Sequence, residues 1–222
     1  MAVDSLRYCD PIQAASQWWD KSLVSALLQH GANINSPALH YDGRTPLQAA
    51  CTVFSKSEVD SRTQMALVQF MLRNNADVNA PAGARHGFTA LQLAAYAGNI
   101  QLLSLLLSHG ALVNTPNHYF RKCALDFAVV NGRLDALHFL LKAGALSYCH
   151  GQSGYEGAIR LARKAPLFAI VDSLHKHVRN NQELFCEQST LAAAHAAAME
   201  DRDWTDDMFS EEWCVEEGCK AW

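Results

Sequence analysis

The sequence predicts an all-α solenoid in which about five units, each made of two antiparallel helices, stack in a row. Two short motifs recur together along the chain, their first residues 34 to 44 positions apart, and such a period is typical of helical repeats. Half of the 222 residues are apolar, which is enough for a continuous core. Only 18% are charged, which excludes a chain that is disordered throughout.

The first motif predicts the start of one helix in each unit. It reads DPIQAA at 10–15, TPLQAA at 45–50, TALQLA at 89–94, CALDFA at 123–128 and, more weakly, GAIRLA at 157–162. Threonine or aspartate at its first place can cap the helix, and proline follows where its missing N–H costs least. The small alanines let a second helix approach closely.

The second motif predicts the end of the partner helix. It reads LLQHGA at 27–32, MLRNNA at 71–76, LLSHGA at 106–111 and LLKAGA at 140–145. Its leucines form an apolar stripe at helical spacing. A left-handed residue then ends the helix, and this place is taken by Gly31, Asn75, Gly110 and Gly144. In the polar loop beyond, Asn35, Asn79 and Asn114 recur at one position, where we expect them to hydrogen-bond the loop.

These units resemble the ankyrin repeat over about residues 8–177. The most specific stretches are Thr45-Pro46-Leu47 with Ala50, and Thr89-Ala90-Leu91 with Ala94, Gly98 and Gly110. The resemblance implies a stack of helix pairs with β-hairpin tips along one side and a concave face that binds proteins. The units begin near residues 10, 45, 89, 123 and 157, within a stack predicted to span 1–177.

Three departures from the repeat pattern carry predictions. The second unit is about ten residues too long, so an insertion at about 52–62 is expected to loop out between its helices. Trp18 and Trp19 stand where a small residue and glycine are usual, as in a first, capping unit. The last unit has the polar character of a cap at the other end, through Arg160, Arg163, Lys164 and Lys176.

The chain beyond the stack has the opposite charge. Residues 1–177 carry 15 Lys and Arg against 11 Asp and Glu, whereas residues 178–222 carry 3 against 11. We expect a short helical extension over 178–199 and a flexible acidic tail over 200–222, whose candidate recruitment residues are Trp204, Met208, Phe209 and Trp213. Alternating acidic and bulky apolar residues are typical of activation regions, which order on binding a partner. Two alternatives are a merely solubilising tail and a tail that docks on a basic, aromatic concave face.

The sequence contains no arrangement typical of catalysis or metal binding. Its ten histidines are scattered, and His30 and His109 occupy the same place in two units, which the repeat explains. No Cys-x-x-Cys pair, phosphate loop or nucleophile elbow is present. The acidic neighbours of Cys214 disfavour a thiolate there. We therefore expect no enzyme, no catalytic residue, no metal and no cofactor.

The positions through which ankyrin repeats bind proteins can be carried over residue by residue. They mix aromatic and basic residues, which are enriched at interface hot spots. The candidate partner-binding residues are Trp18, Tyr41, Asp42, Arg44, Arg85, His86, Phe88, Tyr96, Tyr119, Phe120 and Lys122. Alternatively, Phe88 or Phe120 packs on the neighbouring unit. Nucleic acid is a weaker partner, because the stack has little net positive charge and the acidic tail repels phosphate.

The overall style of the chain, with YEGAIRLA at 155–162, resembles short stand-alone ankyrin-repeat proteins of filamentous fungi. That resemblance implies a monomeric adaptor that acts as a transcriptional co-regulator, bridging a DNA-bound factor to other proteins. The alternative is a cytoplasmic scaffold or inhibitor that occludes a partner enzyme or acts in a sensing complex. No apolar run is long enough for a membrane span. The seven cysteines, an odd number without a Cys-x-x-Cys pair, favour a reduced, intracellular protein, so we expect a cytoplasmic or nuclear location. The partner, the pathway and the sign of regulation are not written in the sequence.

Overall fold

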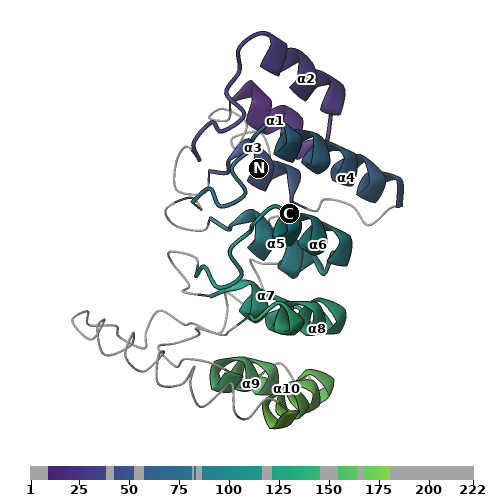
Figure 1. Ribbon diagram of the computed structural model, residues 1–222, viewed down its shortest axis with the longest axis vertical. Helices are drawn as coiled ribbons and strands as arrows, with labels where there is room; N and C mark the ends of the chain where they lie inside the picture. The colour runs from purple at the N-terminus through teal and green to yellow at the C-terminus, as the bar shows by residue number, and fades with distance from the viewer. Residues whose placement is uncertain are drawn as a thin grey trace, which may run out of the picture.

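The computed structural model describes residues 10–38, 43–52, 58–81, 83, 87–116, 122–145, 155–164 and 168–180. The helices of this part pair in chain order and stack along one axis (Figure 1). The pairs are α1 (Pro11–Gln17) with α2 (Lys21–Gln29), α3 (Pro46–Ala50) with α4 (Glu58–Arg73), α5 (Ala90–Ala97) with α6 (Ile100–Ser108), α7 (Ala124–Val130) with α8 (Leu134–Lys142), and α9 (Tyr155–Lys164) with α10 (Phe168–Asn180).

The described residues contain helices and no strand, so the predicted all-α class is confirmed. The loops between successive pairs gather along one side of the stack (Figure 1). The tips of these loops, where β-hairpins were expected, fall largely outside the described residues. None of the described helices has the length and apolar character that a membrane span requires.

The helix starts follow from the capping residues of the first motif. Thr45 Oγ1 accepts a hydrogen bond from Gln48 N at 3.3 Å, and Gln48 Oε1 accepts one from Thr45 N at 3.0 Å. Thr89 and Gln92 form the same reciprocal pair, with distances of 3.3 and 2.9 Å. Each pair satisfies two backbone N–H groups that a helix start leaves without a partner. The predicted caps are confirmed at these two residues.

The turns after the outer helices are left-handed, as the second motif predicts. Gly110 has φ +83° and Asn75 has φ +63°. In the first and third units, the turn between the two helices is also left-handed. In the third unit glycine, Gly98, takes this position, whereas in the first unit Trp19 adopts φ +55° there. A left-handed backbone is unfavourable for a bulky residue, and Trp19 is held there by the bond from its Nε1 to Ala50 O at 2.9 Å.

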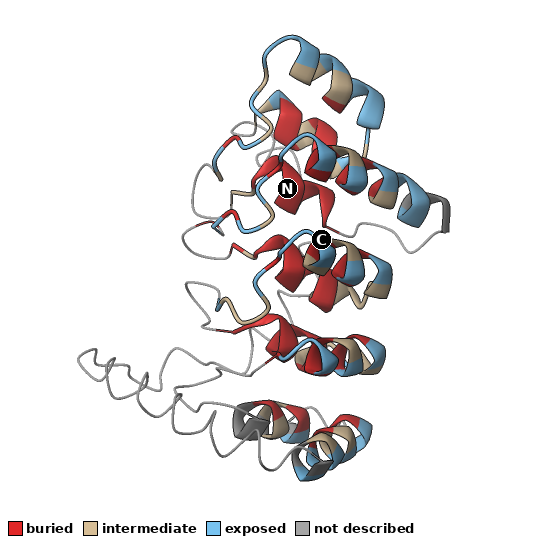
Figure 2. Ribbon diagram, in the orientation of Figure 1, coloured by how far each residue is buried: buried red, intermediate tan, exposed pale blue. Residues whose placement is uncertain are grey.

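The core forms a continuous band between the two rows of helices (Figure 2). Leu47, Leu91 and Leu125 fill it from the inner row, and Leu103 and Leu137 fill it from the outer row, all at most 2% exposed. Burying one such side chain contributes about 1.5–3 kcal/mol. Because each unit buries its leucines against its neighbours, the stack is stabilised mainly by contacts between adjacent helix pairs.

The second unit differs from the expected loop at about 52–62. Residues 53–57 lie outside the described part, and residues 58–62 form the first turns of α4, which is 16 residues long. Buried Gln64 connects α4 to the end of α3, since its Nε2 donates to Ala50 O at 2.9 Å and to Thr52 O at 3.2 Å. The extra residues therefore lengthen the outer helix as well as the connection.

Candidate interaction surface

The loops of successive units are joined by a row of asparagine side chains. Asn79 Nδ2 donates to Gly110 O at 2.9 Å, and Asn79 Oδ1 accepts from Leu112 N at 2.8 Å. The equivalent Nδ2 atoms of Asn35 and Asn114 donate to Asn75 O at 3.0 Å and to Gly144 O at 3.1 Å. The predicted hydrogen-bonding role of these asparagines is confirmed, and each of them fixes one loop relative to the next.

A second row of bonds, made by glutamines, joins the inner helices to the same loops. Gln92 Nε2 donates to Thr115 O at 2.8 Å and to Lys122 O at 3.3 Å. Gln48 and Gln13 make the equivalent bonds to Ala80 O, Pro81 O and Pro37 O, at 2.9, 3.1 and 2.9 Å. Sequence reasoning missed this role. The recurring glutamine of the first motif was the signal, but its acceptors belong to the next loop and are not visible in the motif.

The fourth unit does not continue the glutamine row in the same way. Asp126 takes the glutamine position and accepts from Cys123 N at 2.9 Å and from Cys123 Sγ at 3.2 Å. A carboxylate has no N–H to donate to the following loop. The glutamine bonds of Gln13, Gln48 and Gln92 therefore hold the loops that follow the first three units.

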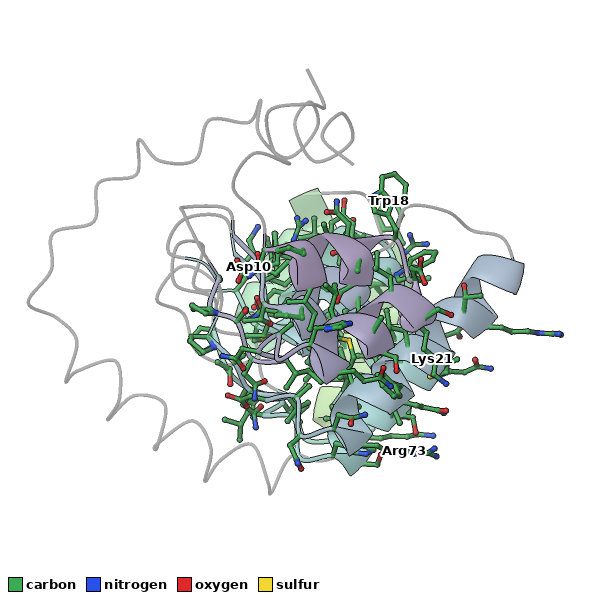
Figure 3. All side chains as sticks on the ribbon, turned by 90° about the horizontal axis from the view of Figure 1, so that it is seen from above. Asp10, Trp18, Lys21 and Arg73 are labelled. Carbon is green, nitrogen blue, oxygen red and sulfur yellow. The ribbon has the colours of Figure 1, made fainter. Side chains whose placement is uncertain are left out.

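The predicted partner-binding residues differ in how accessible they are. Trp18 is 70% exposed and projects outward at the rim of the stack (Figure 3). Arg44 and Tyr96 are half-buried. Six more predicted residues of the stack lie outside the described residues, namely Tyr41, Asp42, Arg85, His86, Tyr119 and Phe120. The tail residues Trp204, Met208, Phe209 and Trp213 also lie outside them.

Two predicted binding residues are engaged in packing within the stack. Phe88 is half-buried and meets Phe127 edge-to-face, with ring centroids 5.0 Å apart and planes at 73°. The alternative for Phe88, packing on the neighbouring unit, is the arrangement observed. Lys122 is only 6% exposed. The contribution of either side chain to a partner contact is therefore smaller than its position in the repeat suggests.

A separate group of basic side chains lies on α8 and α10 at the far end of the stack. His138 Nε2 lies 3.4 Å from Ser173 Oγ, so the two helices present their polar faces together. We call this group the basic surface, and its members are His138, Lys142, His175, Lys176, His177 and Arg179. All are exposed except His177, which is half-buried. Nothing in the sequence connects residues on these two helices.

The electrostatics of the basic surface follow from these contacts. Lys176 Nζ lies 2.7 Å from Asp172 Oδ2, and this hydrogen bond, together with the Lys176 charge, lowers the pKa of Asp172. Burial and the neighbouring charge of His138 lower the pKa of His177. His177 therefore binds a proton less readily than a free imidazole, and a negative charge brought close to it would raise its pKa again.

The two described cysteines, Cys51 and Cys123, are buried thiols. Burial raises the pKa of the Cys51 thiol to about 12, and burial and the charge of Asp126 raise that of Cys123. Neither thiol can act as a nucleophile at neutral pH. His30 and His109 stand at the ends of α2 and α6, as the repeat predicts. Within the described ranges, no three His, Cys, Asp or Glu side chains lie together as metal ligands.

Comparison with known protein families identifies the repeat. A family model described as ankyrin repeats, in three copies, matches residues 58–148. The match begins at α4 and ends beyond α8. No curated protein matches the chain.

Proposed function

Since residues 58–148 are ankyrin repeats, which support a role in protein–protein interaction, we propose that this chain is a non-enzymatic adaptor. The observation that carries the proposal is the loop side of the stack, held by two rows of inter-unit hydrogen bonds. Gln92 and Asn79 illustrate them, with bonds of 2.8 and 2.9 Å to the next loop. A surface ordered before binding loses less conformational entropy when a protein partner binds.

We call Trp18, Arg44 and Tyr96 the binding edge, and we propose that Trp18 on the first unit is part of the contact with a protein partner. An exposed tryptophan offers a large, rigid contact area, and such residues are frequent hot spots. Arg44 and Tyr96 lie on the units that follow and remain half-buried, so they present part of their side chains. The mixture of aromatic and basic groups favours an acidic or amphipathic protein segment as the partner.

The finer proposal is that the adaptor is a transcriptional co-regulator in the nucleus or cytoplasm. It is supported by the tail composition, in which nine Asp and Glu alternate with tryptophan, phenylalanine and methionine over residues 200–217. Such segments dock on co-regulators as induced helices. The stack would hold a DNA-bound factor while the tail recruits a second protein. The alternative is a cytoplasmic scaffold or inhibitor whose stack occludes a partner enzyme.

A reporter assay separates these two functions. Residues 200–222 are tethered to a heterologous DNA-binding domain, beside a control tail in which Trp204, Phe209 and Trp213 are changed to alanine and every charge is kept. Activation or repression that the control loses supports co-regulation. A tail without effect on the reporter removes this support and favours the scaffold.

Affinity purification tests the binding edge in the full chain. Trp18→Ala is compared with Leu23→Ala, because Leu23 is also exposed, at 47%, but lies on the outer helix α2. We expect Trp18→Ala to lower recovery of specific partners at least tenfold and Leu23→Ala to leave it unchanged, with both variants retaining the wild-type circular dichroism spectrum. Equal recovery by the two variants would move the contact away from the edge.

A further inference from the structure

The exposed stripe of α10 carries both cationic and aromatic groups. Phe168, Asp172, Lys176 and Arg179 follow each other at three- and four-residue spacing, so they share one face of the helix. Phe168 is 80% exposed and Lys176 and Arg179 are exposed. A surface with an aromatic end and a basic end fits a peptide in which acidic and aromatic residues alternate.

Helix α8 adds a second line of positive groups beside this stripe. His138 contacts Ser173 of α10 at 3.4 Å, and Lys142 lies one turn further along α8 on the same side. The acidic group of α8 on this side is Asp135, which is exposed. On α9, which also packs against α10, exposed Arg163 adds another cation.

The positive surplus of the stack is concentrated at this end. Residues 134–180 contain six Lys and Arg against three Asp and Glu, together with four histidines. The longer stretch 10–133 contains nine Lys and Arg against seven Asp and Glu. An acidic segment is therefore attracted more strongly to α8–α10 than to the earlier units.

We propose that the basic surface is the docking site for residues 200–217 of the same chain. This segment carries nine acidic residues and one arginine, interspersed with Trp204, Phe209 and Trp213. Its charge complements the cations of α8 and α10, and its aromatic residues match exposed Phe168. The docking site is therefore the outer face of the last two units, and not the concave face that the sequence suggested.

The position of α10 makes an intramolecular contact accessible. The helix ends at Asn180, 19 residues before the acidic segment begins. Nineteen residues can span up to about 60 Å when extended, whereas the 13 residues of α10 extend over only about 20 Å. A tether that reaches its site easily gives an effective concentration on the order of millimolar, which favours the chain's own tail over that of another molecule.

Docking should become stronger as the pH falls. Burial and the neighbouring charge of His138 lower the pKa of His177, and tail carboxylates close to it would favour its charged form. The docked state then binds more protons than the open state, so a lower pH shifts the balance towards docking. The described charged groups around His177 are Asp135 and Lys142 on α8, Arg163 on α9, and Asp172, Lys176 and Arg179 on α10 itself, with Lys176 paired to Asp172 at 2.7 Å. These groups keep one charge through the range in which His177 titrates.

Zero-length carbodiimide cross-linking of the full chain tests the contact, because it joins lysine to carboxylate only where the two touch. We expect cross-links from Lys142 and Lys176 to residues 200–217 in the monomer band, at least tenfold more frequent than those from Lys21 on α2. Their yield should not depend on protein concentration and should fall in about 1 M salt, which screens the attraction. Links found only in a dimer band, or lysine yields that do not differ, would overturn the proposal.

Charge reversal provides a matched control. Lys176→Glu combined with Arg179→Glu should lower the Lys142 cross-links at least fivefold, whereas Arg73→Glu, an exposed reversal at the end of α4, should leave them unchanged. Loss in both variants would indicate a general charge effect and contradict a site on α10. Circular dichroism verifies that each variant is folded.

Histidine titration by NMR gives a second readout in the intact chain. The tail is neutralised by changing Asp203, Asp206, Asp207, Glu211 and Glu212 to their amides. If the wild-type tail docks, this change should lower the apparent pKa of His177 by at least about half a unit. Identical titration curves in the two chains would contradict docking whatever the tail does in the reporter assay, so this proposal and the proposed co-regulator function can fail separately.

Discussion

The strongest single test of how this stack is held together is the replacement of Gln92 by methionine. Gln92 is 1% exposed, and its side chain joins the start of α5 to the loop that follows the third unit. Its Oε1 accepts from Thr89 N at 2.9 Å, while its Nε2 donates to Thr115 O at 2.8 Å and to Lys122 O at 3.3 Å. Methionine keeps the length and helical preference of the side chain and removes all three bonds.

The expected loss of stability can be worked out bond by bond. Thr89 is buried, so its N–H loses its acceptor at a cost of about 1–3 kcal/mol. The carbonyls of Thr115 and Lys122 each lose a bond worth about 1 kcal/mol, the second less because it is longer. The more apolar methionine offsets part of this sum by about 1 kcal/mol. We expect Gln92→Met to lower the free energy of unfolding by about 2–3 kcal/mol.

Urea unfolding of the full chain, followed by far-UV circular dichroism, measures this loss. The matched control is Gln101→Met, because Gln101 is exposed on α6 and should change stability by no more than about 0.5 kcal/mol. Both variants should keep the wild-type dependence of unfolding on urea. A Gln92→Met protein as stable as Gln101→Met would refute the idea that the glutamine row holds the loops.

A third variant, Gln92→Glu, separates the two functions of the amide. The carboxylate keeps the acceptor for Thr89 N and loses the donor to the loop carbonyls. Burial raises the pKa of a carboxyl group at this place above its unfolded value of about 4.3. Relative to the wild type, stability should therefore be highest below pH 4 and fall as the pH rises through the folded pKa. A pH-independent difference would contradict this account.

Three other substitutions or reactions test separate contacts. Trp19→Phe should cost only about 1 kcal/mol in urea unfolding, because the Ala50 carbonyl that loses the Nε1 bond at 2.9 Å keeps a second donor; a loss above 3 kcal/mol would point to packing instead. Gly98→Ala should be more destabilising than Gly110→Ala in the same assay. Both positions have a left-handed backbone, which costs an alanine about 1 kcal/mol. A Cβ at Gly98 would in addition come 2.7 Å from the side chain of Arg133, whereas a Cβ at Gly110 would have no atom within 4 Å. Cys51, with its pKa raised to about 12, should resist a thiol reagent at pH 8 until the chain unfolds, and rapid labelling of its peptide in the native protein, detected by mass spectrometry, would disprove its burial.

Most of the helix boundaries can be predicted from the sequence, because their causes are local. A cap such as Thr89 acts on the N–H three residues later, and a left-handed residue such as Asn75 ends the helix next to it. The second unit shows where this reasoning stops. Its length alone predicted a loop at 52–62, whereas Gln64 bonds to Ala50 and Thr52 and supports a longer helix.

The candidate surface could be predicted only in part. The repeat pattern identified Trp18, and the structure leaves it 70% exposed. The same pattern proposed Phe88 and Lys122, but whether a side chain faces solvent depends on what the next unit places against it. For Phe88 that neighbour is Phe127, 39 positions further along the chain, so no local pattern could settle its exposure.

The sequence by itself determined the repeated helix pairs, the residues that begin and end them, and the contrast in charge between stack and tail. These properties depend on interactions within a few residues, or on composition alone. Only the tertiary structure decided which side chains join one unit to the next. The stacking of helices brings Gln92 to Thr115, 23 positions further along the chain, and His138 to Ser173, 35 positions further. Packing joins groups that are far apart in the sequence, and no local pattern marks them as partners.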